Sequence, residues 1–154
     1  MKFNNAAILK RKSIALKKEL EIVNDMVGRE ALGFFKESFV KQGFTDVSLK
    51  KWQPRKRTKR SEMGRGILLG PNQNMFRALK RKRLNSYTTL IYNDLIYAKV
   101  HNDGLRAGRG RGFIMPKRQF VGNSQTLTNL LKRKIKERLN YFINNYKRSY
   151  RKKE

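Results

Sequence analysis

The single histidine, His101, is the residue best suited to acid–base or metal chemistry in a chain that has no cysteine. Asp94 and Asp103 lie on either side of it and could form a hydrogen-bonded pair with its imidazole. A metal site needs further histidine or cysteine ligands, and nucleophilic catalysis needs an activated serine or cysteine at a suitable place. Neither arrangement is visible. The sequence therefore predicts a structural histidine at a turn, a protein that is not an enzyme, and no bound metal or cofactor.

A glycine- and arginine-rich segment, residues 104–112, follows the histidine. Glycine loops that bind phosphates join a strand to a helix, and the flanks of "GRGRGF" show neither element. Four glycines in this span leave the backbone little reason to adopt one conformation. We therefore expect an exposed loop that Pro116 stiffens at its exit.

The charge balance is the strongest compositional signal. The 154 residues include 38 lysines and arginines against 11 aspartates and glutamates, a formal net charge of +27. This much like charge repels itself, so a polyanion or an acidic protein surface is expected to be part of the working environment, with nucleic acid the first candidate. The candidate contacts to DNA or an acidic partner are Arg55, Lys56, Arg57, Lys59, Arg60, Lys80, Arg81, Lys82, Arg83, Arg106, Arg109 and Arg111.

The length predicts one domain spanning residues 1–154. The lack of cysteine fits synthesis in a reducing cytoplasm. No apolar run approaches the roughly 18 residues of a membrane span, and the start of the chain lacks the apolar stretch of a signal peptide, so no membrane partner is expected.

Two long helices are predicted from apolar residues spaced three and four apart. The first runs from Ser13 to about Gly43, and the second begins at Ser124, a good N-cap. The terminal segments 1–12 and 147–154 are expected to be extended or frayed.

The region between the helices is predicted to contain short strands and basic loops. Residues 45–74 resemble a long loop in which Trp52 is a packing anchor. Strands over 75–83 and 87–93 would form an antiparallel hairpin, although residues 76–84 fit a basic helical turn equally well. Residues 94–102 predict a short helix or turn. The expected fold class is α+β, with a small antiparallel sheet packed against two long helices and long basic loops.

Four segments, taken in order, carry a family resemblance. They are "FFKESFVKQGFTDVSLKKWQPRKR" (34–57), "ILLGPNQNMFRAL" (67–79), "IYAKVHNDG" (96–104) and "IMPKRQFVG" (114–122). Together they resemble the Mu-like phage virion morphogenesis family, also called tail completion proteins, over most of the chain. Asn102-Asp103 departs from that pattern, which more often has glutamine and then an apolar or aromatic residue. The landmark residues that match it are Phe39, Gly43, Trp52, Pro54, Gly70, Tyr97, Ala98, His101, Gly104, Pro116, Arg118, Phe120 and Gly122.

The resemblance implies a structural protein of the virion that acts at the head–tail junction and completes the tail or seals the neck. It implies a homo-oligomeric ring whose partners are portal, neck or tail proteins, with packaged DNA as a further candidate. The protein would be made in the host bacterial cytoplasm and reside in the virion. The loop at 104–112 would reach a neighbouring subunit. An alternative is a basic nucleic-acid-binding protein of ribosomal or nucleoid type, which explains the charge but not the order of the landmarks.

Overall fold

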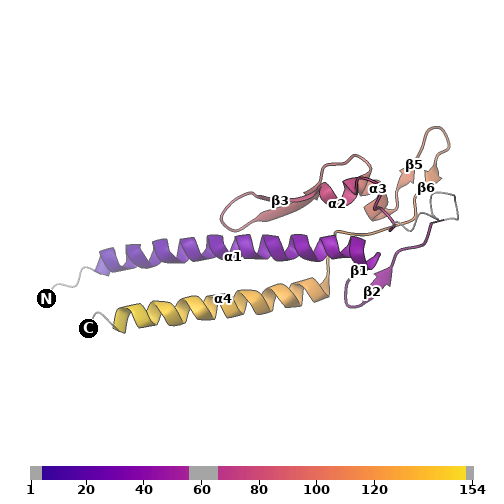
Figure 1. Cartoon of the computed structure of the whole chain (residues 1–154). Coiled ribbons are helices and arrows are strands. Elements are labelled where there is room, and N and C mark those ends of the chain that lie inside the picture. Colours follow the sequence, from indigo (N-terminus) through magenta and orange to yellow (C-terminus); the bar gives the residue numbers. More distant parts are fainter. Residues whose placement is uncertain (1–4, 56–65, 152–154) are drawn as a thin grey trace.

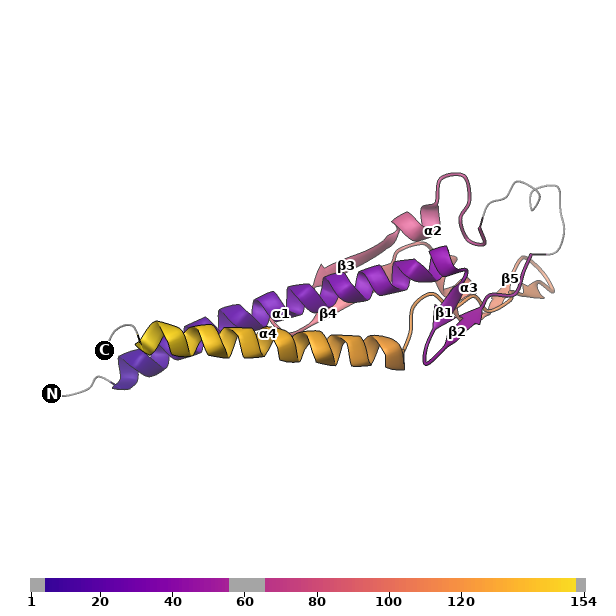
Figure 2. The ribbon, with the colours of Figure 1, turned by 60° about the horizontal axis from the view of Figure 1, so that its bottom comes forward.

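Two long antiparallel helices form the body of the molecule (Figure 1). The computed structural model describes residues 5–55 and 66–151. Helix α1 (Asn5–Lys41) and helix α4 (Gln125–Arg151) lie side by side in both views, and the first turn of α1 and the last turn of α4 are at the same end of this pair (Figures 1 and 2). The short elements gather along α1 and at the opposite end.

Within residues 5–55 and 66–151, three separate two-stranded antiparallel sheets lie between the long helices in the chain. They confirm the predicted α+β class, although the single predicted sheet is replaced by three pairs. In chain order the elements are β1 (Gly43–Thr45), β2 (Leu49–Lys51), α2 (Asn74–Arg77), β3 (Leu79–Arg83), β4 (Thr89–Asn93), α3 (Ala98–Asp103), β5 (Arg106–Ala107) and β6 (Phe113–Ile114).

Both long helices extend further toward the chain ends than the spacing of apolar residues predicted. Residues 5–12 and 147–151 are helical, where extended or frayed ends were expected, and residues 1–4 and 152–154 lie outside the described part. Neither added stretch contains proline or glycine, so nothing in it interrupts a helix. Helix α1 ends as predicted within two residues of Gly43, where Gln42 adopts a left-handed φ of 53°.

The start of α4 is capped from two directions. The hydroxyl of Ser124 accepts a hydrogen bond from the Leu127 amide at 3.1 Å, which confirms the predicted N-cap. A carboxylate oxygen of Asp46, in the β1–β2 turn, accepts another from the Gln125 amide at 2.9 Å. The predicted loop over 45–74 therefore contains strand β2 and a turn that anchors α4.

The predicted hairpin is present as β3 and β4, paired with Arg81 opposite Ile91. The first three residues of the predicted strand, 75–77, are instead helical, because residues 74–78 close one turn through the Ala78 amide and the Asn74 carbonyl at 2.8 Å. The alternative of a helical turn over 76–84 is correct only for 76–77. The short helix predicted within 94–102 is confirmed as α3.

The hydrophobic core lies where α1 meets the short elements. Phe39 is fully buried there, with ring centroids 5.7 Å from Trp52, 5.9 Å from Phe76 and 5.2 Å from Phe120. Offset and edge-to-face pairs of this kind add to the free energy gained from burying the rings. Trp52 is therefore the packing residue that the sequence predicted.

Candidate functional site

Landmark residues from three distant segments meet at one end of the molecule. Besides the ring contacts of Phe39, the indole Nε1 of Trp52 donates a hydrogen bond to the carbonyl of Gln119 at 2.7 Å. Ala98 and Phe120 are buried in the same core cluster. We call the segments 39–54, 96–104 and 116–122 the landmark unit.

Asn102 holds two of these segments together. Its side-chain oxygen accepts hydrogen bonds from the amides of Phe120 and Val121, both at 3.0 Å. The Arg118 amide donates to the His101 carbonyl at 2.7 Å. No role for Asn102 was predicted from the sequence, because its partners lie 18 and 19 residues further along the chain.

Two glycines of the landmark unit occupy positions where a side chain would not fit. Gly104 ends α3 with a φ of 73°, and a Cβ there would lie 2.9 Å from the Cβ of Lys117. A Cβ at Gly43 would lie 2.5 Å from the carbonyl oxygen of Lys50. Both glycines permit close approach of two backbones.

His101 lies beside a pocket of about 230 Å³ that Tyr97, Gly70 and Met75 also line. Its Nδ1 is buried and has no hydrogen-bond partner among the described residues. Burial lowers the pKa of His101, and the nearby Arg118 guanidinium lowers it further, so the imidazole is neutral at pH 7.

The acids that flank His101 in the sequence are engaged elsewhere. Asp94 accepts a hydrogen bond from Lys80 at 3.0 Å, which lowers the pKa of Asp94. Asp103 accepts one from the side chain of Asn102 at 2.8 Å. The structure therefore shows no histidine–carboxylate pair at His101, and residues 5–55 and 66–151 contain no group of three potential metal ligands.

Arg118 is a buried cation of the landmark unit. Its Nε and Nη2 both donate to the Gln53 carbonyl at 3.4 Å, which joins the last landmark segment to the residue before Pro54. Desolvation by burial and the charge of Arg55 lower the pKa of Arg118. The remaining landmarks lie at the edge of the unit: Pro54 and Gly70 are exposed, and Pro116 and Gly122 are half-buried.

The structure divides the candidate basic residues into two groups. Three have internal partners: Lys80 pairs with Asp94, Arg81 pairs with Asp25 at 2.5 Å, and Arg55 donates to the Gly66 carbonyl at 2.7 Å. Lys82, Arg83, Arg106, Arg109 and Arg111 are exposed and make no ion pair with a described residue. The candidates Lys56, Arg57, Lys59 and Arg60 lie outside the described residues.

The exposed candidates do not form one surface. Lys82 and Arg83 are at the end of β3 near the hairpin loop, whereas the three arginines belong to β5 and the turn that follows it, at the far end of the molecule (Figure 1). The segment predicted as an exposed loop, 104–112, includes β5 and leads into β6, so a short hairpin presents its arginines.

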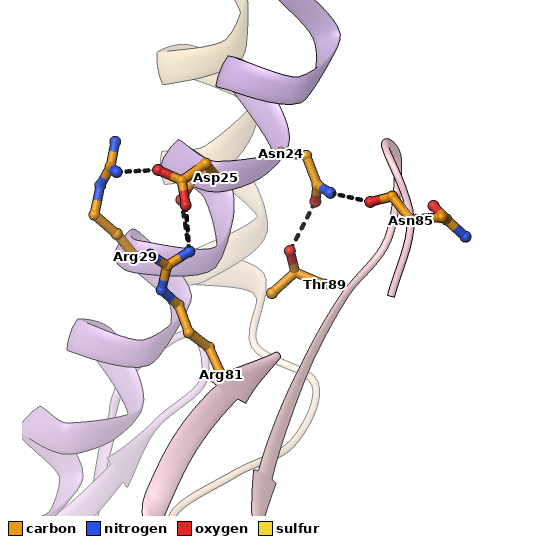
Figure 3. A network of polar contacts seen from close by, with 6 residues as sticks. All are labelled: Asn24, Asp25, Arg29, Arg81, Asn85 and Thr89. Atoms are coloured by element: carbon orange, nitrogen blue, oxygen red, sulfur yellow. Dashed lines mark hydrogen bonds and ion pairs between the residues drawn. The ribbon is translucent and has the colours of Figure 1, made fainter. Parts of the chain in front are cut away.

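A polar network fixes the β3–β4 hairpin on α1 (Figure 3). Asp25 receives both Arg29 and Arg81, and the hydrogen bond from Arg81 lowers the pKa of Asp25. Asn24 accepts from the Thr89 hydroxyl at 2.9 Å and donates to the Asn85 carbonyl at 3.0 Å. Arg81, predicted as a partner contact, thus stabilises the fold, a role that no local spacing could indicate.

The fold defines an α+β protein built on an antiparallel helix pair, with the landmark unit at one end. No family model, no curated protein and no solved structure matches the chain. In residues 5–55 and 66–151, none of the helices is long and apolar enough to span a membrane.

Proposed function

We propose that the chain is a non-enzymatic structural subunit of a bacteriophage virion that acts at the head–tail junction as part of a homo-oligomeric ring. The observation that carries this proposal is the meeting of the landmark segments, which resemble the tail completion family, in one packed unit. The Trp52 bond to Gln119, the Phe39 contact with Phe120 and the Asn102 bonds each join two of those segments. The segments that carry the resemblance therefore pack together in this chain.

Exposed apolar side chains at the same end support assembly with neighbouring copies. Ile96 is 95% exposed and Val47 is 77% exposed, and Val40, Phe113 and Ile114 are exposed as well. They belong to or adjoin elements around the landmark unit (Figure 1). Exposed apolar side chains also occur away from the landmark unit, such as Leu9 and Ile14 of α1. Where such side chains form a patch, they are typical of surfaces that a partner covers. In a ring, each subunit would place one such patch against a different patch of the next subunit.

The proposal is tested by the oligomeric state of the purified protein, measured by native mass spectrometry and negative-stain electron microscopy. We expect closed rings, which Ile96→Asp together with Val47→Asp should dissociate. Tyr87→Asp is the matched control, since Tyr87 is 69% exposed in the β3–β4 loop, away from the landmark unit. Cryo-electron microscopy of particles that contain the protein should then show its density at the head-to-tail junction. A protein that stays monomeric and is absent from particles would contradict the proposal.

A second candidate is a basic nucleic-acid-binding protein of ribosomal or nucleoid type. The exposed cations without described ion-pair partners, such as Lys82, Arg83 and Arg109, favour it. Recovery of the protein on ribosomes or bulk DNA, with none in particles, would favour this function over the first.

A further inference from the structure

One face of α4 carries cations and amides on the side that points away from α1. Its exposed members are spaced three and four apart, apart from one adjacent pair, so they share one side of the helix. The opposite side of α4, with Leu127, Leu131 and Arg138, packs on α1. The polar members of the outer face, as we call it, are Lys132, Arg133, Lys136, Asn140, Asn144 and Lys147, and one apolar side chain, Ile143, lies among them with 46% of its surface exposed.

The acids near this face are turned inward or lie at its edge. Glu19 of α1 is buried and receives Arg138 at 2.5 and 3.0 Å, and Glu30 receives Lys134 at 2.5 Å. Within α4, Glu137 is the only acidic residue, and it lies 4.0 Å from Arg133. Lys132, Lys136 and Lys147 make no ion pair with a described residue. The carboxylates of Glu19 and Glu30 are thus neutralised by Arg138 and Lys134 between the helices, and the outer face keeps its positive charge.

The length and straightness of the face suit an extended polyanion. From residue 132 to residue 147 the helix rises about 22 Å, at about 1.5 Å per residue. A duplex carries one phosphate charge per roughly 1.7 Å of its axis, so each lysine along this line would meet phosphates. In both views α4 packs on α1 along one side and its other side is open (Figures 1 and 2).

The outer face offers no aromatic surface for unpaired bases. Among the described rings of α4, Phe142 lies 5.7 Å from Tyr146, and Tyr141, which is 61% exposed, lies outside the outer face with the Arg138 guanidinium 5.5 Å from its ring. Proteins that bind single strands stack successive bases on aromatic side chains, whereas contacts to a duplex backbone need only cations and hydrogen-bond donors. We propose that the outer face of α4 binds the phosphate backbone of a nucleic-acid duplex.

The test compares two triple variants that remove the same charge from different places. One is Lys132→Gln, Lys136→Gln and Lys147→Gln; its matched control is Arg106→Gln, Arg109→Gln and Arg111→Gln on the β5–β6 hairpin. Fluorescence anisotropy with a short duplex DNA of mixed sequence gives the affinity between about 50 and 200 mM salt. We expect the α4 variant to reduce the slope of log K against log salt by about 2 to 3, since each phosphate contact contributes about 0.9.

Equal losses in the two variants would show that total charge alone governs binding and would overturn the proposal. Tighter binding of a single strand than of the duplex would overturn it as well. So would polyglutamate binding that depends on the α4 lysines, if duplex binding did not depend on them. Repeating the measurement with a duplex RNA shows whether the outer face binds duplex DNA or duplex RNA more tightly. Circular dichroism must show unchanged helix content in both variants. The inference does not depend on ring assembly: rings without duplex binding would remove it and leave the proposed function standing.

Discussion

Trp52 and Gln119 are joined by a 2.7 Å hydrogen bond from the indole nitrogen to the main-chain carbonyl, across 67 residues of sequence. Trp52 is 6% exposed, so its ring packs in the core while its one polar atom is satisfied by the segment that precedes α4. This bond makes the Trp52 ring both a packing element and a tie between the first and last landmark segments.

Trp52→Phe should lower the free energy of unfolding by about 1–3 kcal/mol, because the Gln119 carbonyl loses its donor and the smaller ring leaves space. Trp52→Ala should cost about 3–5 kcal/mol. Urea denaturation followed by circular dichroism measures both values. Tyr87→Phe, at an exposed position, should change stability by less than about 0.5 kcal/mol. Equal stability of Trp52→Phe and the parent protein would show that the bond contributes nothing.

Two glycines in α1 should respond to alanine in opposite directions. A Cβ at Gly28 would lie 2.8 Å from the Thr89 methyl, and the Thr89 hydroxyl is held by Asn24. Gly28→Ala should therefore displace the β3–β4 hairpin and destabilise the protein by about 1–3 kcal/mol. A Cβ at Gly33 meets nothing within 4 Å, so Gly33→Ala should stabilise by up to about 1 kcal/mol. Thermal unfolding of the two variants measures both changes in stability. A stability gain in both variants would mean that the hairpin does not pack closely against Gly28.

The ion pair of Glu19 and Arg138 should show a favourable coupling energy, so that removing one partner costs more stability than replacing both. The Glu19 side chain is 5% exposed and that of Arg138 is 32% exposed. Arg138→Met should cost about 1–3 kcal/mol, because it leaves the Glu19 carboxylate buried without its cation. The double change Glu19→Leu with Arg138→Met should recover most of that loss. A double-mutant cycle in urea measures the coupling, and additive losses would show that the pair does not interact.

Stability should fall as the pH drops from about 7 to about 5, because of His101. Burial and the Arg118 charge hold its pKa in the folded protein below the ordinary value of 6.5, so the unfolded chain takes up the proton first. The stability that neutral His101 contributes to the folded protein is therefore complete above pH 6.5, and it is lost as the pH falls through the lower pKa of the folded state.

No other histidine titrates in this window, and Asp25 and Asp94 have pKa values below their ordinary 3.8. His101→Gln should flatten the dependence of the unfolding free energy on pH between about 5 and 7. Urea midpoints at several pH values measure it, and the same slope in the variant and the parent would assign the effect to another group.

Local sequence determined the elements whose signals are short-range. The three-and-four spacing of apolar residues predicted both long helices, and Ser124 marked the start of α4, because helix periodicity and capping depend on residues within one or two turns. The alternation over 87–93 predicted a strand for the same reason, and residues 89–93 of it form β4. The extra turns at the ends of α1 and α4 were missed because residues 147–151 contain a single apolar residue, while the apolar residues of 5–12 are the consecutive run 6–9, which is not spaced three and four apart.

Tertiary structure alone decided which polar groups have partners. Arg81 resembled an exposed cation in the run "KRKR", but Asp25, 56 residues earlier, binds it against α1. Asp46 caps a helix that begins 79 residues later, and Asn102 bonds the backbone of the last landmark segment. Such contacts depend on how α1, the hairpins and α4 pack, and packing is set by long-range burial that no local period encodes. Sequence thus determined the helices and the charge, and the fold decided which charges remained on the surface.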